Sequence, residues 1–201
     1  MDLKRYHEKL AQLTLPIVEF NGNFIISDKP DLQDVENNIG IEVTSVESKE
    51  EGVFRALLVK HANQELTSNE FINLLKNPYF KQKVIPNNSR IVARVKPSDI
   101  NILIRQVFCS VCIKADKFEN YKNFYLNGLY LFDIVHFLPE HIQFIYDVLK
   151  NTTFPFDFYI LNIGDKIYYM DKKCLKEYYI KEQVTRLQNL ACEYAKNKKI
   201  D

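Results

Sequence analysis

The sequence predicts a mixed α/β fold in which helices flank a central mixed sheet. Apolar residues recur at helical spacing near both ends of the chain and in its middle. Short apolar runs, alternating or continuous, lie between these segments and are typical of strands. Helical and strand-like segments interleave along the chain, which is the order expected when helices cover the faces of a sheet.

Length and composition are those of a folded domain. The chain has 201 residues, of which 46% are hydrophobic and 26% are charged, so it can bury a sizeable core. We expect a single domain over 1–201. Within it, a core spans about 1–65, further sheet and helices span about 66–173, and a terminal helix spans about 174–196.

Charge and hydropathy narrow the function classes. The formal net charge is +1, from 27 basic and 26 acidic residues, so contact with nucleic acid would need a local basic patch. No apolar run reaches the roughly eighteen residues of a membrane span, and residues 1–13 are typical of an amphipathic helix, not of a signal peptide. We therefore expect a cytoplasmic protein without membrane association.

The N-terminal segment is predicted to form a helix and a hairpin. Residues 2–13 carry apolar side chains at helical spacing, and Pro16 then forces the chain out of the helix. The segments 16–22 and 23–30 are strand-like and meet at an Asn-Gly pair, which is a two-residue turn signal. A polar connection follows.

The next predicted strand, IGIEVTSV over 39–46, alternates between two faces. Its two faces carry Ile39, Ile41 and Val43 on one side and Gly40, Glu42 and Thr44 on the other. Helical spacing then predicts a helix over about 48–63 and a short one over 67–77.

The rest of the chain follows the same mixed pattern. The expected elements are a short strand or an extended loop within 89–99, a long helix from 98 or 99 to just before Asn127-Gly128, a strand over 129–135, a helix over 138–151, a hairpin over 156–171 that turns at Gly164-Asp165, and an amphipathic helix over about 174–196.

Two carboxylates near the start of the chain form a candidate metal site. Asp31 follows Pro30 at the end of the second predicted strand, and Glu42 lies on the polar face of the next one. If these strands are neighbours, both carboxylates can point into one cleft and, with the backbone carbonyl of Val43, supply the oxygen ligands that Mg²⁺ prefers. Spacing alone favours the alternative, in which Asp31 is a turn residue and Glu42 faces solvent.

The segment PDLQDVENNIGIEVTSV resembles the core motif of the PD-(D/E)XK phosphodiesterase superfamily, the fold of many restriction endonucleases and of repair and phage exonucleases. In that motif a Pro-Asp pair is followed, after a variable gap, by an acidic residue, any residue and lysine. Here the match is Pro30-Asp31 and Glu42-Val43-Thr44. The ending in threonine is similar to uncharacterised bacterial and phage-borne members.

The order of expected elements is also similar to that of the family core, which is a helix, a three-stranded meander, a helix and a strand. The match covers about residues 1–65 by motif and the rest by element order. The resemblance implies a restriction-endonuclease-like sheet, Mg²⁺ or Mn²⁺ held by Asp31, Glu42 and Val43, and hydrolysis of DNA phosphodiester bonds.

Thr44 occupies the position of the family's lysine. That lysine stabilises developing charge or orients the attacking water, and a neutral hydroxyl supplies no cation. Some family members place the lysine on a neighbouring helix, so Lys49, Lys60 and Lys114 are all candidates for the missing cation. Thr44 itself can hydrogen-bond a metal-bound water.

Many family members also place an extra acidic residue in the N-terminal part. Glu8 on the first helix and Glu19 on or beside the first predicted strand are candidates for this position. For each of them, a solvated surface position is the commoner explanation.

A basic stretch supplies candidate contacts to nucleic-acid phosphates. Between positions 81 and 97 there is no acidic residue, and cations in such loops contact phosphates and position the duplex. The alternative is a solvated loop and an edge strand protected by charge. The predicted substrate-binding side chains are Lys81, Lys83, Arg90, Arg94 and Lys96.

Other candidate motifs have simpler explanations. Cys109 and Cys112 form a C-x-x-C pair inside a helical apolar pattern, so we expect buried thiols and not a zinc or redox site. The spacing of His136 and His141 fits no metal signature. No Gly-rich phosphate loop, nucleophile elbow or H-E-x-x-H motif is present.

Two functions thus follow from the sequence. The first is an Mg²⁺-dependent nuclease whose partner is nucleic acid, with DNA favoured. The second is a catalytically inactive module of the same fold that binds nucleic acid or a protein partner, which the threonine at position 44 favours. A homodimer stays open in both cases.

Overall fold

The computed structural model divides the chain into two compact units, Met1–Val46 with Val107–Asp201, and Glu47–Gln106. Each unit is described by itself, and the expectation of a single domain stays a prediction. The residues that the structure describes are 2–46, 84–87, 90–93, 100–132, 137–180 and 182–197.

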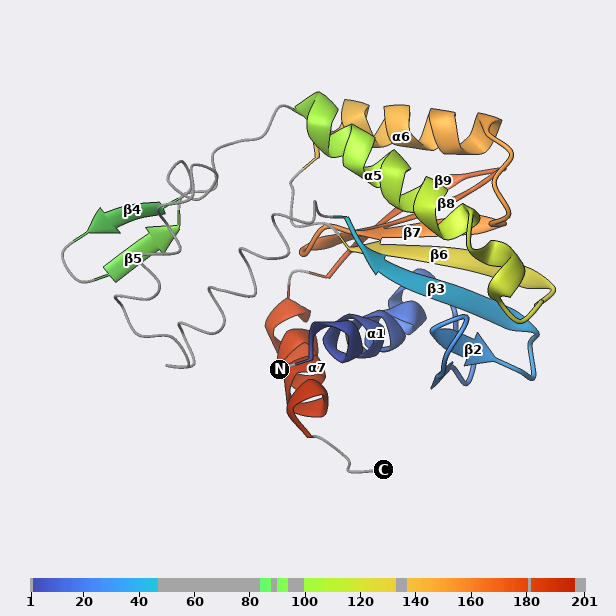
Figure 1. Ribbon diagram of the computed structural model, residues 1–201, viewed down its shortest axis with the longest axis horizontal. Coiled ribbons are helices and arrows are strands. Elements are labelled where there is room, and N and C mark those ends of the chain that lie inside the picture. The colour runs from blue at the N-terminus through green and yellow to red at the C-terminus, as the bar shows by residue number, and fades with distance from the viewer. Residues whose placement is uncertain are drawn as a thin grey trace. The chain divides into compact units, whose positions relative to one another are not determined.

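The larger unit is built on a seven-stranded mixed sheet with the strand order β1-β2-β3-β6-β7-β8-β9 (Figure 1). Neighbouring strands are antiparallel from β1 to β3, parallel from β3 to β7 and antiparallel from β7 to β9. The prediction of a mixed α/β fold is therefore confirmed. The strands are β1 Ile25–Ile26, β2 Leu32–Asp34, β3 Ile39–Ser45, β6 Leu126–Phe132, β7 Phe158–Asn162, β8 Lys166–Asp171 and β9 Leu175–Tyr179.

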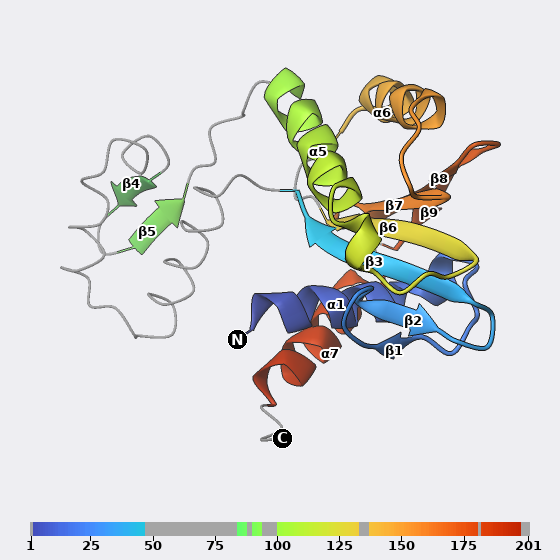
Figure 2. The same cartoon turned by 45° about the vertical axis from the view of Figure 1, so that its right-hand side comes forward.

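Helices cover both faces of this sheet. On one face, α1 (Leu3–Thr14) and α7 (Val184–Lys196) lie side by side, as Figures 1 and 2 both show. On the other face lie α6 (Pro139–Asn151) and the part of α5 (Ile100–Ala115) that begins at Val107. The described helices thus form the outer layers and the sheet forms the middle one. None of them is long and apolar enough to cross a membrane.

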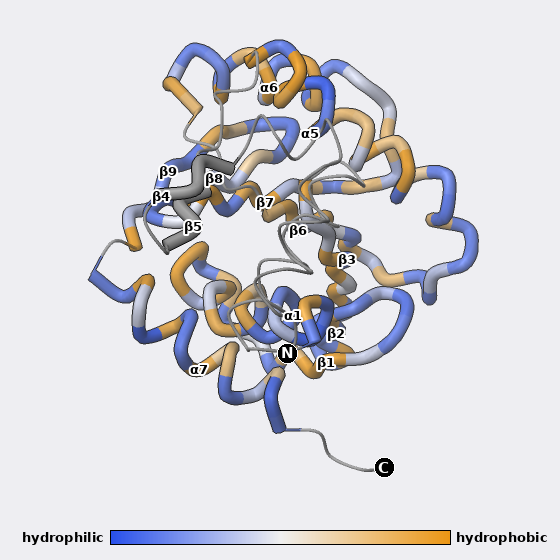
Figure 3. Tube along the Cα trace, turned by 60° about the vertical axis from the view of Figure 1, so that its left-hand side comes forward, coloured by the Kyte–Doolittle hydropathy of each residue, from blue (hydrophilic) through white to orange (hydrophobic). Residues whose placement is uncertain are grey.

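The main core lies between the sheet and the α1 face. Apolar side chains from α1 and the central strands are buried there, and Figure 3 shows the hydrophobic segments gathered along β6 and β7. Fully buried members of this cluster are Ala11, Leu15, Leu32, Ile41, Tyr130, Ile160 and Ile167. Burial on this scale holds β3 and β6 in place at the centre of the sheet.

Several predicted elements are confirmed. The helix over 2–13 is α1, whose N-cap Asp2 accepts a hydrogen bond from the Lys4 amide at 3.0 Å. The strand over 39–46 is β3, the helix over 138–151 is α6, and the hairpin over 156–171 is β7–β8 with Gly164 at φ 99° in its turn.

The predicted hairpin over 16–30 is wrong. Leu15–Val18 forms a short 3-10 helix, η1, and β1 is only two residues long. Leu15 and Val18 are both buried in the core, which a turn with three-residue spacing allows and an alternating strand does not. As a consequence β1 pairs with β2, and Asp31 lies in the turn before β2 instead of at the end of a strand.

The predicted terminal helix over 174–196 is wrong in its first part. Leu175–Tyr179 is strand β9, which pairs with β8. The turn between them is fixed by Asp171, which accepts backbone hydrogen bonds from Lys173 and Cys174, each at 2.7 Å. The long predicted helix also ends early, at Ala115, and a short 3-10 helix, η2 (Phe118–Asn120), follows.

In the smaller unit, β4 (Val84–Asn87) and β5 (Arg90–Ala93) form an antiparallel pair. The short strand predicted within 89–99 is therefore present as β5. The helices predicted over 48–63 and 67–77 lie outside the described residues.

Candidate metal and active site

Asp31 and Glu42 are brought together by the β2–β3 pairing. Leu32 pairs with Ile41, and one further step in this antiparallel register places Asp31 opposite Glu42. The backbone amide of Val43 donates to Asp31 Oδ2 at 2.9 Å. Both carboxylates are buried, with exposed fractions of 4% for Asp31 and 6% for Glu42. The alternative in which Glu42 faces solvent is thus wrong.

A glycine beside this pair lets the Asp31 turn pack closely. Gly40 precedes Glu42 by two residues on β3, and a Cβ placed there would lie 2.7 Å from Pro30 Cγ and 2.6 Å from Phe124 Cδ2. A side chain at position 40 would push these rings away. The missing side chain therefore helps to hold Pro30, and with it Asp31, against β3.

Lys114 supplies a cation to Glu42. It lies in the last turn of α5, and its Nζ is 2.5 Å from Glu42 Oε1. The Lys114 side chain is only 20% exposed, so this ion pair is partly shielded from water. Of the three lysines considered from the sequence, Lys49 and Lys60 lie outside the described residues. The other carboxylate oxygen, Glu42 Oε2, is buried and makes no hydrogen bond of good geometry among the described residues, although Tyr121 lies close enough to interact with Glu42.

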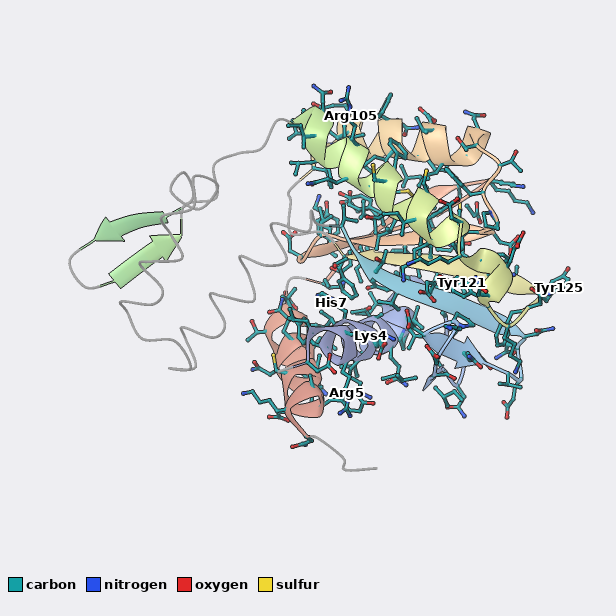
Figure 4. All side chains as sticks on the ribbon, in the orientation of Figure 1. Lys4, Arg5, His7, Arg105, Tyr121 and Tyr125 are labelled. Carbon is teal, nitrogen blue, oxygen red and sulfur yellow. The ribbon has the colours of Figure 1, made fainter. Side chains whose placement is uncertain are left out.

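Glu8 and Lys4 complete the cluster from the α1 side. Glu8 is 5% exposed, and Lys4 lies one helical turn before it. Lys4 Nζ is 3.4 Å from Glu8 Oε1 and 3.5 Å from Asp31 Oδ1. Figure 4 shows Lys4 on α1 and Tyr121 just after η2, on opposite sides of β3. The Glu8 candidate from the sequence is therefore a buried acid beside Asp31 and not a solvated one.

The cluster carries more negative charge than its lysines compensate. The pKa of Glu8 is raised to about 7, first by burial and then by the negative charge of Asp31, against the opposing effect of Lys4. Burial also raises the pKa of Glu42, again with help from Asp31 and against Lys114. Both shifts show that these carboxylates lack the solvation or positive charge that a fully ionised site needs.

Tyr121 adds a protonated hydroxyl to the site. It is half-buried, and its pKa is raised first by burial and then by the negative charge of Glu42. At neutral pH the phenol therefore keeps its proton and can donate a hydrogen bond.

The donor set fits a hard divalent cation. Carboxylate oxygens are the ligands that Mg²⁺ prefers, and a buried acceptor without a partner is an open coordination position. No group of three or more His, Cys, Asp or Glu side chains within the described ranges is arranged to hold a metal ion. An ion at Asp31 and Glu42 would thus take its other ligands from the backbone, water or substrate, which is common for Mg²⁺.

The remaining predicted site residues do not all lie here. Thr44 is half-buried on β3, two residues beyond Glu42. Glu19 is exposed and forms an ion pair with Lys176 on β9 at 2.7 Å, so it is a surface residue and no part of the cluster. Arg90 lies in β5. Outside the described residues lie Lys81, Lys83, Arg94 and Lys96.

The cysteine and histidine expectations have separate outcomes. Cys109 and Cys112 are exposed on α5, so the prediction of buried thiols is wrong. His141 Nδ1 accepts a hydrogen bond from the Leu138 amide at 3.1 Å, which makes it a helix-capping residue. His136 lies outside the described part of the chain.

Lys4 and Tyr121 were missed by sequence reasoning. The i,i+4 spacing of Lys4 and Glu8 is visible in the sequence but is typical of ordinary surface pairs. No sequence pattern connects Tyr121 to Glu42, since only the turn after α5 brings them together.

Comparisons with protein-family models, with curated proteins and with solved structures give no match to this chain.

Proposed function

We propose that this protein hydrolyses DNA phosphodiester bonds with Mg²⁺ or Mn²⁺ at a PD-(D/E)XK-like site. The contact between Lys114 and Glu42, beside Asp31, is the observation that supports this most. Thr44 cannot supply a positive charge at this point. Lys114 supplies one from the neighbouring helix α5. An acidic pair with an adjacent ammonium is the residue set that the family resemblance implies.

The order of elements around the cluster supports the same proposal. Within the larger unit, and apart from the short 3-10 helices, the chain runs from α1 through the antiparallel strands β1, β2 and β3 to α5 and then to β6, which is parallel to β3 (Figure 2); β4 and β5 of the smaller unit lie between β3 and α5 in the sequence. This order is similar to the helix, three-stranded meander, helix and strand that the family resemblance implies. Glu8 on α1, buried beside Asp31, is the proposed counterpart of the extra acidic residue that many members carry.

Asp31 and Glu42 would hold the metal ion, with the Val43 carbonyl as a further oxygen donor. When bound, Mg²⁺ supplies Lewis-acid stabilisation of phosphate charge and lowers the pKa of a water molecule. The Val43 amide fixes the orientation of Asp31. Lys114 holds positive charge next to Glu42, where it can stabilise a phosphate oxygen as negative charge develops. Tyr121, which stays protonated, can donate to the same oxygen.

Nucleic acid is the proposed partner because the PD-(D/E)XK resemblance implies a DNA substrate, although the acidic site itself repels a polyanion. Cations must then lie elsewhere, and the basic stretch from Lys81 to Lys96 remains the proposed backbone contact. An overall charge of +1 makes this contact local, so binding should weaken steeply with salt.

The test is cleavage of plasmid and linear DNA with Mg²⁺ or Mn²⁺ by the native chain and by the Glu42→Ala and Lys114→Met variants. We expect the native chain to cleave and both variants to lose most of the activity. Lys176→Met is the matched control, because it also breaks a lysine–glutamate pair but at an exposed position. It should cleave like the native chain.

Two results would separate the candidate functions. Cleavage that persists in Glu42→Ala would exclude Glu42 as a metal ligand. DNA binding without cleavage under either metal would favour the inactive binding module, the function that the threonine at position 44 supports.

A further inference from the structure

We propose that Lys4 is an internal counter-ion that occupies the Asp31–Glu8 edge of the site and is displaced when a divalent cation binds Asp31. The inference rests on the proposed metal site and adds a residue that competes with the metal. It predicts that the affinity for metal is set partly by a lysine that is not itself a ligand.

The two oxygens of Asp31 are used differently. Oδ2 accepts the Val43 amide at 2.9 Å, so it is held by the backbone of β3. Oδ1 is the oxygen that Lys4 Nζ approaches at 3.5 Å. A metal ion that binds Asp31 through Oδ1 would therefore meet the Lys4 ammonium at the same atom, and two cations cannot share it closely without repulsion.

Lys4 is held weakly enough to be displaced, in contrast to Lys114. Its side chain is 65% exposed, whereas the carboxylates it bridges are only about one-twentieth exposed. Its contacts of 3.4 Å and 3.5 Å are longer than the roughly 2.7–3.2 Å of a normal N–H···O hydrogen bond. Lys114, at 2.5 Å from Glu42 and 20% exposed, is held much more firmly.

The position of Lys4 on the helix is also unfavourable by itself. It lies in the first turn of α1, which contains no acidic residue. The positive end of the helix dipole disfavours a cation in that turn. The attraction of Glu8 and Asp31 offsets this effect, so the Lys4 ammonium stays at the site until another cation takes its place.

The experiment is calorimetric titration of the full chain with Mn²⁺, without DNA, for the native protein and for Lys4→Met. Removal of the competing ammonium should tighten Mn²⁺ binding, because the metal no longer has to displace Lys4. The gain should be only about two- to tenfold, since the ion pairs of a largely exposed ammonium are weak. The Lys4→Arg variant keeps the charge and should bind Mn²⁺ about as the native chain does.

Lys9→Met is the matched control on the same helix. Lys9 contacts the Tyr194 ring at 5.2 Å and donates to Gln12, away from the carboxylates. Its removal lowers the net charge equally but should leave Mn²⁺ affinity unchanged. If Lys9→Met tightened binding as much as Lys4→Met, a general charge effect would explain the result and the proposal would be overturned.

The other outcomes are equally decisive. Unchanged or weaker Mn²⁺ binding by Lys4→Met would overturn the proposal that Lys4 competes with the metal. The proposed metal site is tested separately by Asp31→Asn, and loss of Mn²⁺ binding in that variant would support the site even if Lys4 does not compete. Absence of any Mn²⁺ binding by native and variant chains would overturn both. A thermal-denaturation scan gives a second readout: Mn²⁺ should raise the transition temperature more for Lys4→Met than for the native chain.

Discussion

Two buried polar clusters lie beside the central strands, and they differ in how their groups are satisfied. In the first, the Tyr130 hydroxyl on β6 bonds Thr14 Oγ1 of α1 at 2.6 Å and accepts from Asn162 Nδ2 of β7 at 2.9 Å. Asn162 Oδ1 accepts the Gly164 amide at 2.9 Å. This cluster is neutral, and each of these groups has a partner.

The second cluster, Glu8, Asp31 and Glu42, is charged and incompletely paired. It has Lys4 and Lys114 as counter-ions but retains a buried oxygen without a partner and raised carboxyl pKa values. A satisfied polar network stabilises the folded state, whereas an unsatisfied one destabilises it unless a ligand binds. This contrast indicates that the first cluster stabilises the fold, whereas the second is suited to binding a ligand.

The largest expected effect is on activity and comes from the charged cluster. Glu42→Gln keeps the size of the side chain and an oxygen for Lys114 but removes the negative charge. We expect DNA cleavage to fall by at least about 100-fold, with little change in the thermal transition. Parallel cleavage assays and thermal denaturation test this. If Glu42→Gln lost much stability but kept its specific activity, the charged cluster would be a structural feature and not a binding site.

The next effect is on stability and comes from the neutral cluster. Tyr130→Phe removes the hydroxyl that pairs with Thr14 and Asn162. Because Asn162 then keeps a buried donor without an acceptor, unfolding should become easier by about 1–3 kcal/mol. Urea denaturation measures this. Tyr125→Phe is the control, since Tyr125 is 80% exposed; equal losses in both variants would remove the special role of the network.

A smaller effect concerns pH. The folded-state pKa of Glu8, about 7, lies above the ordinary glutamate pKa of 4.5, so between these values the folded state binds more protons than the unfolded one. Stability from this group is therefore fully present below about pH 4.5 and is lost as the pH rises to about 7, at up to about 1.4 kcal/mol per pH unit. Glu42 contributes with the same sign.

Urea denaturation at several pH values between 5 and 7 measures this slope. Glu8→Gln should flatten it, whereas Tyr130→Phe should lower the curve without changing its slope in this range. An unchanged slope in Glu8→Gln would show that the buried acid is not the source of the pH dependence.

The smallest effect is expected at the surface. Lys176→Met breaks the exposed pair with Glu19, and exposed ion pairs contribute little in water. Neither the thermal transition nor the cleavage rate should change measurably. If Lys176→Met changed either quantity as much as Glu42→Gln does, the exposed Lys176–Glu19 pair would matter as much as the partly buried Lys114–Glu42 pair, contrary to this prediction.

Sequence reasoning predicted best where the local pattern is strong. The helix α1, the strand β3 and the β7–β8 hairpin follow from periodicity and turn residues. It failed at 16–30 and at 175–179, where pairing between distant strands and burial decide the structure. There, Leu15 and Val18 enter the core through a 3-10 turn, and Asp171 turns the chain into β9.

The same limit applies to the site. Asp31 and Glu42 could be found because a short motif places them near each other in sequence. Lys114 was one of three candidates, and only the packing of α5 on the sheet brings it to Glu42. Lys4 and Tyr121 could not be found, because their role depends on how α1 and the turn after η2 approach the carboxylates.

The bond from the Val43 amide to Asp31 also bears on ion size. With Oδ2 held at 2.9 Å by the backbone, Asp31 has one oxygen left and is disfavoured as a bidentate ligand. Ca²⁺ takes six to eight oxygens and often uses bidentate carboxylates, whereas Mg²⁺ needs about six ligands in a compact octahedron. At the proposed metal site, this single backbone amide would favour the smaller ion, and we expect Ca²⁺ to compete weakly with Mg²⁺ without replacing it.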